Sequence, residues 1–383
     1  MTENKYLVDG PRVVAIDSST TSTKAIVVDA EGNIWHTAKQ NIQLHTPAMD
    51  QYEHNPIRWW ETSRATIGEV LSKLSPTDRS RIAAIGITHQ RESFTPFDKD
   101  GRPLRNGILW LDGRATEQIR RYGSEHIHEL SGKPAGVTPA IYKMAWVKEH
   151  EPEIFADAYK VMDVHGYVAW MLIGRPVSSQ AAADSLGLFD IQKRDWSDEL
   201  LDIAGVSREQ MADLVEPSYD EMGTLRTELA EELGIAEVPV IAGLGDGQAA
   251  GIGAAAVDPE IGFLNLGTAV NAGVDSPIYR YDKVFRTHVS GIPGNYVFEV
   301  LDRDRTSSLP VVEEYEQNLA GAVAGYRHKF AFAAVHELHR QDTFRRSSTL
   351  SPTLGGSLRQ PRTRCRTPRR LRVASPPRTR PRR

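Results

Sequence analysis

The sequence predicts an α/β protein in which polar turns follow short buried strands. Two strands are predicted at residues 12–17 and 24–29, with apolar runs at 13–16 and 25–28. The acid Asp17, six consecutive hydroxyl residues and Lys24 lie between these runs, which is typical of a β-hairpin with a tight polar turn. Apolar side chains recur at helical spacing over residues 55–74. Further along, a predicted strand at 238–242 runs into a glycine-containing turn and a small-residue helix at 249–256. Strands and helices alternate in this way in α/β folds.

The remaining elements are predicted from the same two patterns. Compact apolar runs bounded by turn residues indicate strands, and apolar positions three to four residues apart indicate helices. The segment 160–171 begins as a strand and continues as a helix. We expect further strands at 82–88, 107–111 and 262–266, a hairpin turn at 98–101, and helical segments at 116–151 and 200–233.

The chain changes character near residue 301. Residues 302–344 are predicted to be irregular because they lose most of the apolar periodicity. Residues 345–383 contain 13 Arg and no Asp, Glu or Lys, and too few large apolar side chains to offset the entropy of ordering. We predict a disordered basic tail there. Because Arg and Pro accumulate as in an out-of-frame reading of a GC-rich gene, we hypothesise a frameshift or truncation near residue 302.

Composition narrows the class of protein. With 383 residues the chain has room for two or three domains, and outside the basic tail it carries 33 basic and 50 acidic residues, a formal charge of −17. Such an acidic body does not suggest a nucleic-acid partner. The single cysteine, Cys365, excludes an intrachain disulfide and a multi-cysteine zinc site. No signal peptide or membrane-spanning run is evident, so we expect a cytoplasmic protein without a membrane partner.

The first polar turn, from Asp17 to Lys24, has the chemistry of a phosphate site. Its hydroxyl and backbone N–H groups can cradle phosphate oxygens while the carboxylate faces a hydrated Mg²⁺. The alternative is a Ser/Thr-rich loop that only satisfies its own backbone.

Two further turns resemble the first in position and composition. Residues 245–248 follow a strand and place Asp246 at the start of a helix, where glycines allow close approach of a ligand. Residues 267–268, Gly-Thr, follow the strand predicted at 262–266 and suit a second phosphate. The alternative for Asp246 is a simple helix cap.

A fourth polar cluster ends the strand at 82–88. Gln90, Arg91 and Glu92 follow that strand, and Trp110 lies downstream. Charged, amide and aromatic groups together suit a small hydroxyl-rich ligand. In the alternative interpretation Arg91 and Glu92 pair with each other on the surface, and Trp110 belongs to the core.

These motifs, taken in order, resemble those of the FGGY family of carbohydrate kinases over roughly residues 11–300. The resemblance implies an actin-like (ribonuclease H-like) ATPase fold, with a first domain at 11–245 and the start of a second, incomplete domain at 246–301. The motifs are Asp-x-x-Thr-Thr-Ser-x-Lys at 17–24, Gly-Ile-Thr-His-Gln-Arg-Glu-Ser at 86–93, Ile-Leu-Trp-Leu-Asp-Gly-Arg at 108–114, Asp-Ser-Leu-Gly-Leu-Phe-Asp at 184–190, Gly-Asp-Gly-Gln at 245–248 and Asn-Leu-Gly-Thr at 265–268.

The resemblance also implies a role for each polar turn. Asp246 matches the catalytic base that contacts the substrate and accepts the proton of its attacking hydroxyl. Asp17 matches the acid that positions Mg²⁺. The other matching residues form the ATP phosphate loops (Thr20, Thr21, Ser22, Lys24, Gly267 and Thr268) and the substrate-binding strand end (Gln90, Arg91, Glu92 and Trp110).

The implied activity is ATP-dependent phosphorylation of a small sugar or polyol. Arg91-Glu92 is similar to glycerol kinases, whereas residues 17–20, 193–197 and 265–268 are similar to xylulose kinases. We place xylulose first and glycerol second. Two alternatives remain: an inactive remnant that binds sugar without turnover, and an RNA-associated protein acting through its basic tail. A homodimer is compatible with the sequence.

Overall fold

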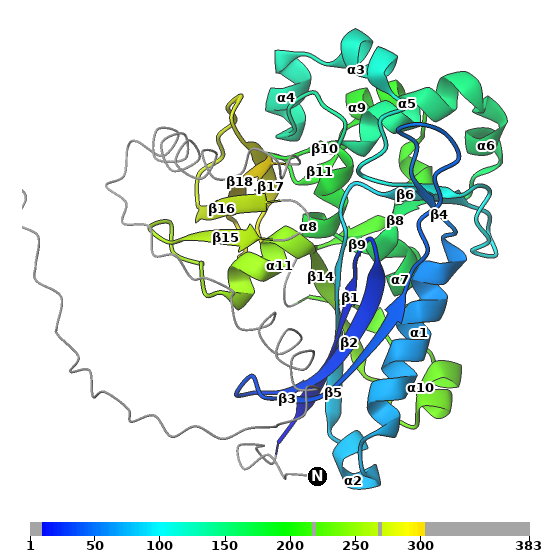
Figure 1. Ribbon diagram of the computed structural model, residues 1–383, viewed down its shortest axis with the longest axis vertical. Helices are drawn as coiled ribbons and strands as arrows, with labels where there is room; N and C mark the ends of the chain where they lie inside the picture. Colours follow the sequence, from blue (N-terminus) through cyan, green and yellow to red (C-terminus); the bar gives the residue numbers. More distant parts are fainter. Residues whose placement is uncertain (1–9, 217–219, 267–269, 303–383) are drawn as a thin grey trace, which may run out of the picture. The chain divides into compact units, whose positions relative to one another are not determined.

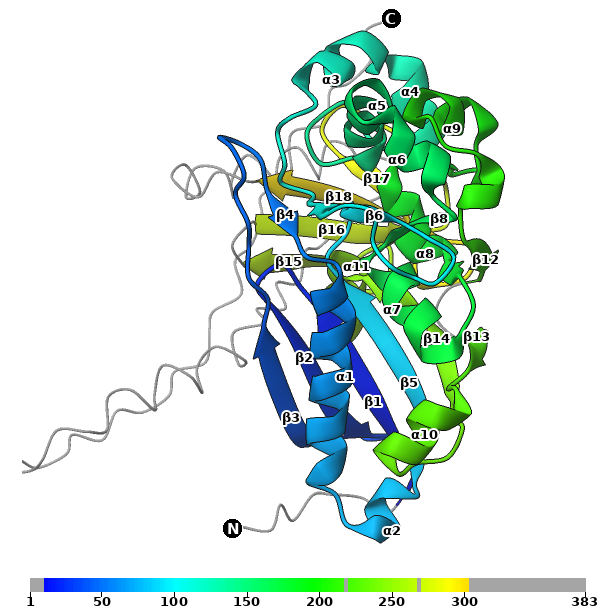
Figure 2. The same cartoon turned by 90° about the vertical axis from the view of Figure 1, so that its right-hand side faces the viewer.

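The computed structural model describes residues 10–216, 220–266 and 270–302, which all belong to one compact unit of the chain. The predicted α/β class is confirmed. Within the described residues the largest sheet has six strands in the order β13-β14-β5-β1-β2-β3 (Figures 1 and 2). These strands are β13 (Glu221–Thr224), β14 (Pro239–Gly245), β5 (Ile82–His89), β1 (Arg12–Ser18), β2 (Ser22–Asp29) and β3 (Ile34–Asn41).

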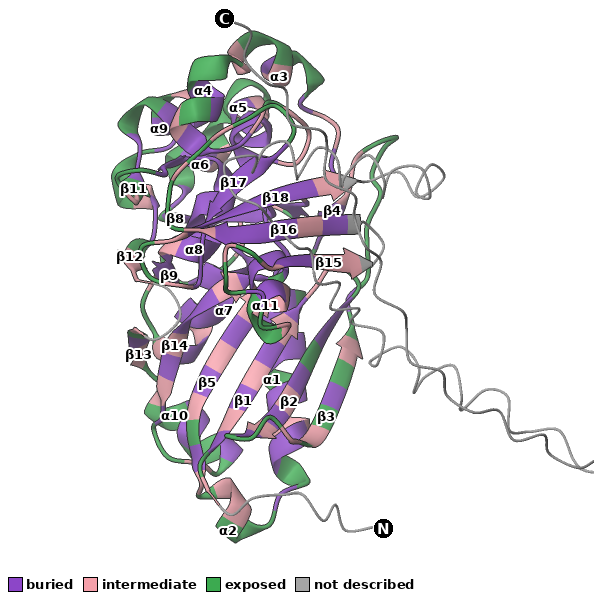
Figure 3. Ribbon diagram, turned by 90° about the vertical axis from the view of Figure 1, so that its left-hand side faces the viewer, coloured by how far each residue is buried: buried purple, intermediate pink, exposed green. Residues whose placement is uncertain are grey.

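The predicted N-terminal hairpin forms one side of this sheet. β1 and β2 pair in antiparallel register, and Val14, Ile16 and Val27 are fully buried. Buried and intermediate positions alternate along β1 (Figure 3). β5 pairs in parallel with β1 on one side and with β14 on the other. The carboxyl ends of these three strands therefore reach the same edge of the sheet, which is where ligands bind in open α/β sheets.

Helices α1 (Ile57–Ser72) and α7 (Val164–Ile173) cover one face of the sheet (Figure 2). α1, predicted at 55–74, buries Trp59, Ile67 and Val70, which lie on one side of the helix because their spacing follows its turns. α7 is apolar and buried around most of its circumference. These side chains join those of the sheet in one apolar core.

A second group of elements lies between α1 and α7 in the sequence, except for its first strand, which precedes α1. In the described part of the chain it contains a four-stranded sheet in the order β4-β7-β6-β8. Its strands and neighbouring elements are β4 (Glu53–His54), α2 (Pro76–Arg79), β6 (Phe94–Phe97), β7 (Gly107–Ile108), α3 (Thr116–Tyr122), α4 (Glu125–Ser131), α5 (Ala140–His150), α6 (Pro152–Asp157) and β8 (Lys160–Asp163).

A third sheet follows helix α11 (Asp246–Gly253). Its strand order is β15-β16-β18-β17, and β15 (Gly262–Leu266) has the predicted bounds. The others are β16 (Val270–Ser276), β17 (Arg286–Val289) and β18 (Tyr296–Asp302). Phe285 and Phe298 pack in the same apolar cluster as residues of α5, so the core continues past position 245. The domain boundaries drawn from the resemblance stay predictions.

The prediction of a helical region at 200–233 is wrong over its centre. α9 (Asp198–Ala204) ends at Gly205, whose φ of +80° a side chain rarely adopts. A short helical turn (Arg208–Gln210), β12 (Asp213–Val215) and β13 precede α10 (Thr227–Leu233). β12 pairs with β9 (Val177–Ser179), a long-range contact that local periodicity does not reveal.

Smaller differences concern the ends of elements. The strand predicted at 107–111 is limited to Gly107–Ile108, and the helix predicted from residue 249 already begins at Asp246. The remaining short elements are α8 (Gln180–Ala183), the turn Asp184–Leu186, β10 (Phe189–Asp190) and β11 (Asp195–Trp196). The irregular segment predicted at 302–344 lies outside the described residues except for Asp302, which ends β18, and the tail predicted at 345–383 lies entirely outside them. None of the described helices is long and apolar enough to cross a membrane.

The buried N-cap of α7 leads to a prediction about stability. Oδ1 of Asp163 accepts the N–H of Gly166 at 2.7 Å, whereas Oδ2 is buried and has no hydrogen-bond partner among the described residues. Burial raises the pKa of Asp163 to about 7, from 3.8 in the unfolded chain. Because the folded state binds the proton more tightly, this group lowers stability as the pH rises between those values.

We therefore expect Asp163→Asn to stabilise the protein at about pH 8 by up to about 4 kcal/mol, and by much less at about pH 5. The amide oxygen keeps the cap while the buried charge is removed. Urea denaturation of both chains at the two pH values measures the difference. An equal effect at both pH values would contradict the prediction.

Candidate active site

Three of the predicted polar turns meet at one edge of the six-stranded sheet. Ser18 at the end of β1 and Gly245 at the end of β14 both lie opposite His89 at the end of β5. Since neighbouring strands are ~4.8 Å apart, the ends of β1 and β14 are about 10 Å apart. The structure therefore brings Asp17, residues 90–92 and Asp246 together. Gly267 and Thr268, the predicted second phosphate loop, lie outside the described residues.

The first turn is linked to the end of β5 by side chains. The Trp110 indole N–H donates to Thr20 Oγ1 at 2.9 Å, and Thr20 donates to Gln90 Oε1 at 3.1 Å. Ser93 Oγ accepts the Trp110 backbone N–H at 3.1 Å. Thr20 therefore faces the predicted substrate residues, and Trp110 is half-buried beside them.

The other residues of this turn differ in exposure. Ser22 is buried, and its carbonyl accepts the backbone N–H of Ser19 at 3.0 Å and the Ser19 hydroxyl at 2.8 Å, which closes the turn. Thr21 and Lys24 are exposed. This turn therefore presents a hydroxyl and an ammonium group to solvent.

Arg91 is buried and contacts residues far away in the sequence. Its guanidinium lies 3.2 Å from Asp246 Oδ1, donates to Glu299 Oε1 at 2.8 Å, and donates to Gln248 Oε1 at 3.3 Å. Glu92, also buried, pairs with Arg286 at 2.6 Å. The alternative of an Arg91–Glu92 pair on the surface is wrong, because each side chain has a different, buried partner.

Three of these partners are residues that sequence reasoning missed. Arg286 on β17 and Glu299 on β18 each contact the end of β5 across roughly two hundred positions, and Asn271 on β16 donates to Glu299 at 3.4 Å. The one signal in the sequence is Glu299 itself, since a lone acid inside the apolar run at 296–301 needs a buried partner.

Asp246 begins helix α11 directly after β14. Its Oδ1 accepts the N–H of Gly247 at 2.8 Å and faces Arg91, and 48% of its side chain is exposed. Desolvation by the surrounding protein raises the pKa of Asp246, with contributions from the negative charges of Glu299 and Glu92 and opposition from Arg91. The helix-cap alternative does not account for the ion pair with Arg91.

Asp17 is the second carboxylate at this edge. Burial, followed by the negative charge of Asp246, raises the pKa of Asp17 to about 6, while Lys24 acts in the opposite direction. The negative charge of Asp246 thus raises the proton affinity of Asp17, and a cation bound between the two carboxylates would relieve that repulsion. The described residues contain no group of three or more His, Cys, Asp or Glu that could hold a metal ion. Mg²⁺ that arrives with nucleotide phosphates needs only one or two protein carboxylates, so the residues present fit it.

Gly245 gives a direct test of how tightly this site is packed. A Cβ at this position would lie 2.3 Å from Arg91 Cδ and 2.5 Å from Gln248 Oε1. We expect Gly245→Ala to destabilise the protein by about 1–3 kcal/mol through displacement of the Arg91 stem. Gly253, in the last turn of the same helix, has no atom within 4 Å of an added Cβ. Gly253→Ala is the matched control, and we expect it to be neutral or stabilising by about 0.5–1 kcal/mol. Urea denaturation of both variants compares them, and equal effects would contradict tight packing at Gly245.

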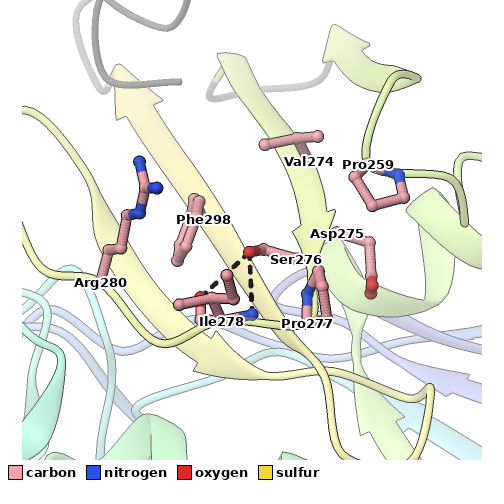
Figure 4. Close-up of a pocket in the computed structure, with 8 residues that line it drawn as sticks. All are labelled: Pro259, Val274, Asp275, Ser276, Pro277, Ile278, Arg280 and Phe298. Carbon is pink, nitrogen blue, oxygen red and sulfur yellow. Dashed lines mark hydrogen bonds between the residues drawn. The ribbon is translucent and has the colours of Figure 1, made fainter. Parts of the chain in front are cut away.

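A separate pocket lies on the third sheet (Figure 4). It is lined by residues 274–278 with Pro259, Arg280 and Phe298. Within this lining, Ser276 Oγ donates to the Ile278 carbonyl at 3.0 Å. The lining includes none of the predicted site residues. The candidate site is therefore the edge formed by β1, β5 and β14.

Comparison with known proteins identifies the family of this chain. The model of the FGGY family of carbohydrate kinases, N-terminal domain, matches residues 12–253. A glycerol kinase of Thermococcus gammatolerans is 32% identical over 296 residues, which are 75% of this chain and 59% of that protein. A xylulose kinase of Escherichia coli is 31% identical over 261 residues, 67% of this chain and 52% of that protein. This chain thus spans a little over half the length of these relatives.

A solved structure extends the likeness to the fold. The crystal structure of a xyloylose kinase from Brucella ovis superposes with a TM-score of 0.74 at 27% identity, covering 81% of this chain and 64% of that chain. The actin-like fold implied by the motifs is confirmed. Since the family match covers more than half of the residues, the chain belongs to the FGGY family of carbohydrate kinases.

Proposed function

We propose that the protein is an ATP-dependent kinase that transfers the γ-phosphate of ATP to a hydroxyl of a small sugar or polyol. The observation that carries the proposal is the half-exposed Asp246 carboxylate, which Arg91 holds at the same sheet edge as Asp17. The Asp246 carboxylate then serves the acceptor hydroxyl, and the Asp17 carboxylate serves the phosphate groups of ATP. Family membership supports this division.

Asp246 is the proposed base. The acceptor oxygen forms a bond to the γ-phosphorus, the bond from that phosphorus to the β,γ-bridging oxygen breaks, and ADP leaves. The hydroxyl proton passes to the Asp246 carboxylate. Phosphoryl transfer needs alignment and neutralised charge more than covalent help, so a base held by Arg91 and by the N–H of Gly247 is sufficient.

Asp17 is the proposed residue for Mg²⁺, with Asp246 beside it. When bound with the nucleotide, Mg²⁺ neutralises charge on the phosphates. Thr21 and Lys24 are exposed next to Asp17 and are proposed to contact phosphate oxygens, with the Ser22 backbone shaping the turn. Gly267 and Thr268 are proposed as the second phosphate loop.

The acceptor is proposed to bind against the end of β5. Trp110, Thr20 and Gln90 form one hydrogen-bonded row, which gives a half-buried aromatic ring and polar groups side by side. Sugars and polyols bind to such surfaces through their C–H faces and hydroxyl groups. Arg91 and Glu92 border this row, with their charges engaged by protein partners. We propose xylulose first, because residues 17–20, 193–197 and 265–268 are similar to xylulose kinases. Glycerol is second, because Arg91-Glu92 is similar to glycerol kinases. Relatives of both names match this chain.

The test is an ADP-release assay with a panel of ketoses and polyols, combined with calorimetric binding of the same compounds. Sugar-dependent release of ADP supports the kinase, and a preference for xylulose over glycerol supports the proposed acceptor. Binding without ADP release identifies a sugar-binding protein without turnover. The absence of both sugar binding and ADP release would overturn the proposal. A cytoplasmic location and a homodimer stay predictions.

A further inference from the structure

A continuous row of charges joins Asp246 to the third sheet. Asp246 faces Arg91 at 3.2 Å, Arg91 donates to Glu299 at 2.8 Å, and Arg286 donates to the same Glu299 oxygen at 2.9 Å. Arg286 then pairs with Glu92 at 2.6 Å, which returns the row to the end of β5. Acids and bases alternate throughout, so every contact within the row is attractive.

Glu299 stands at the centre of this row. Its side chain is fully buried, and Oε1 accepts from both arginines while Oε2 accepts from Asn271 at 3.4 Å. The two arginines outweigh the effect of burial and hold the pKa of Glu299 at about 2. A carboxylate that stays ionised and is held on both oxygens is a fixed anchor for the guanidinium of Arg91.

The backbone around Asp246 is built to approach this anchor. A Cβ at Gly247 would lie 2.4 Å from Glu299 Oε2 and 2.9 Å from Arg91 Nη2, so only glycine permits this contact. Glu92 has a φ of +58°, an unusual conformation for a side chain of its size. Its ion pair with Arg286 holds it there, as expected where surrounding contacts maintain local strain.

From this geometry we propose that Glu299 is a positioning residue: by anchoring Arg91 it sets the direction of the Asp246 carboxylate. The third sheet then contributes to the catalytic site through the contact of Glu299 with Arg91. The inference rests on the proposed role of Asp246 as base. It does not depend on which sugar is bound.

The test compares three variants of the full chain. Glu299→Gln keeps the shape and removes the charge, and Glu299→Asp keeps the charge on a shorter stem. The matched control is Glu53→Gln, because Glu53 is also a buried carboxylate whose Oε1 accepts from two arginines, Arg105 at 2.9 Å and Arg114 at 2.8 Å. Glu53 is not part of the proposed active site.

The first readout is hydrogen–deuterium exchange of the unliganded protein, which needs no activity. We expect Glu299→Gln to speed exchange in peptides covering 88–95 and 244–250, and Glu53→Gln to leave these peptides unchanged. Unchanged exchange at both segments in Glu299→Gln overturns the proposal. If that variant does not fold, the same comparison is made with Glu299→Asp, for which we expect a smaller change in the same peptides.

The second readout is turnover. We expect Glu299→Gln to lower kcat by about 10- to 100-fold with KM changed less than about threefold, and Glu299→Asp to recover part of that loss. Faster exchange with unchanged kcat overturns the link to catalysis. If the wild type shows no turnover, the kinase proposal is refuted. If Glu299→Gln nevertheless exchanges faster in the two segments, the positioning of Asp246 by Glu299 stands.

Discussion

Replacing Asp246 with Asn is expected to lower kcat by about 10²- to 10⁴-fold, the usual contribution of a general base. The amide has nearly the shape of the carboxylate and can still accept the Gly247 N–H, which is 2.8 Å from Oδ1 in the wild type. What it lacks is the capacity to take the proton of the acceptor hydroxyl. The measurement is the ADP-release assay at saturating ATP with xylulose and with glycerol.

The control for this experiment is Asp202→Asn. Asp202 is an exposed residue of α9, far from the sheet edge in sequence and in fold. We expect its kcat to equal that of the wild type. Calorimetry of Asp246→Asn should still detect the acceptor. If Asp246→Asn retained the wild-type kcat, another group would have to take the proton of the acceptor hydroxyl.

Replacing Arg91 with Met is expected to destabilise the protein by about 3–5 kcal/mol, the usual effect of removing one partner from a buried ionic network. Met fills much of the space of the arginine stem but supplies no charge. Among the described residues, Glu299 then keeps Arg286 as its one cationic partner, and Asp246 and Gln248 lose their contacts with the guanidinium. Urea denaturation of wild type and variant measures the loss.

Arg208→Met is the matched control for Arg91→Met. Arg208 also bridges two acids, Asp195 at 2.9 Å and Asp198 at 3.0 Å, but 42% of its side chain is exposed. Because solvent screens exposed pairs, we expect a loss below about 1 kcal/mol. Equal losses in the two variants would contradict the view that burial makes the Arg91 network critical.

The local elements of this protein could be predicted because their patterns are short. The hairpin of β1 and β2 follows from two apolar runs around a polar turn, and α1 from the spacing of Trp59, Ile67 and Val70. The region around β12 could not be predicted, because β12 is stabilised by pairing with β9 more than thirty residues away. A strand that depends on a distant partner has no local signature.

By itself the sequence determined the family, the α/β class and the identity of the polar turns that contain Asp17, Arg91 and Asp246. Each is a local property, since a turn is recognised from neighbouring residues. Only the tertiary structure decided how those turns are supported. It gave Arg91 and Glu92 separate buried partners and placed Glu299, 208 positions from Arg91, at the centre of their network. Charges pair according to distance in space, and folding alone brings such residues together.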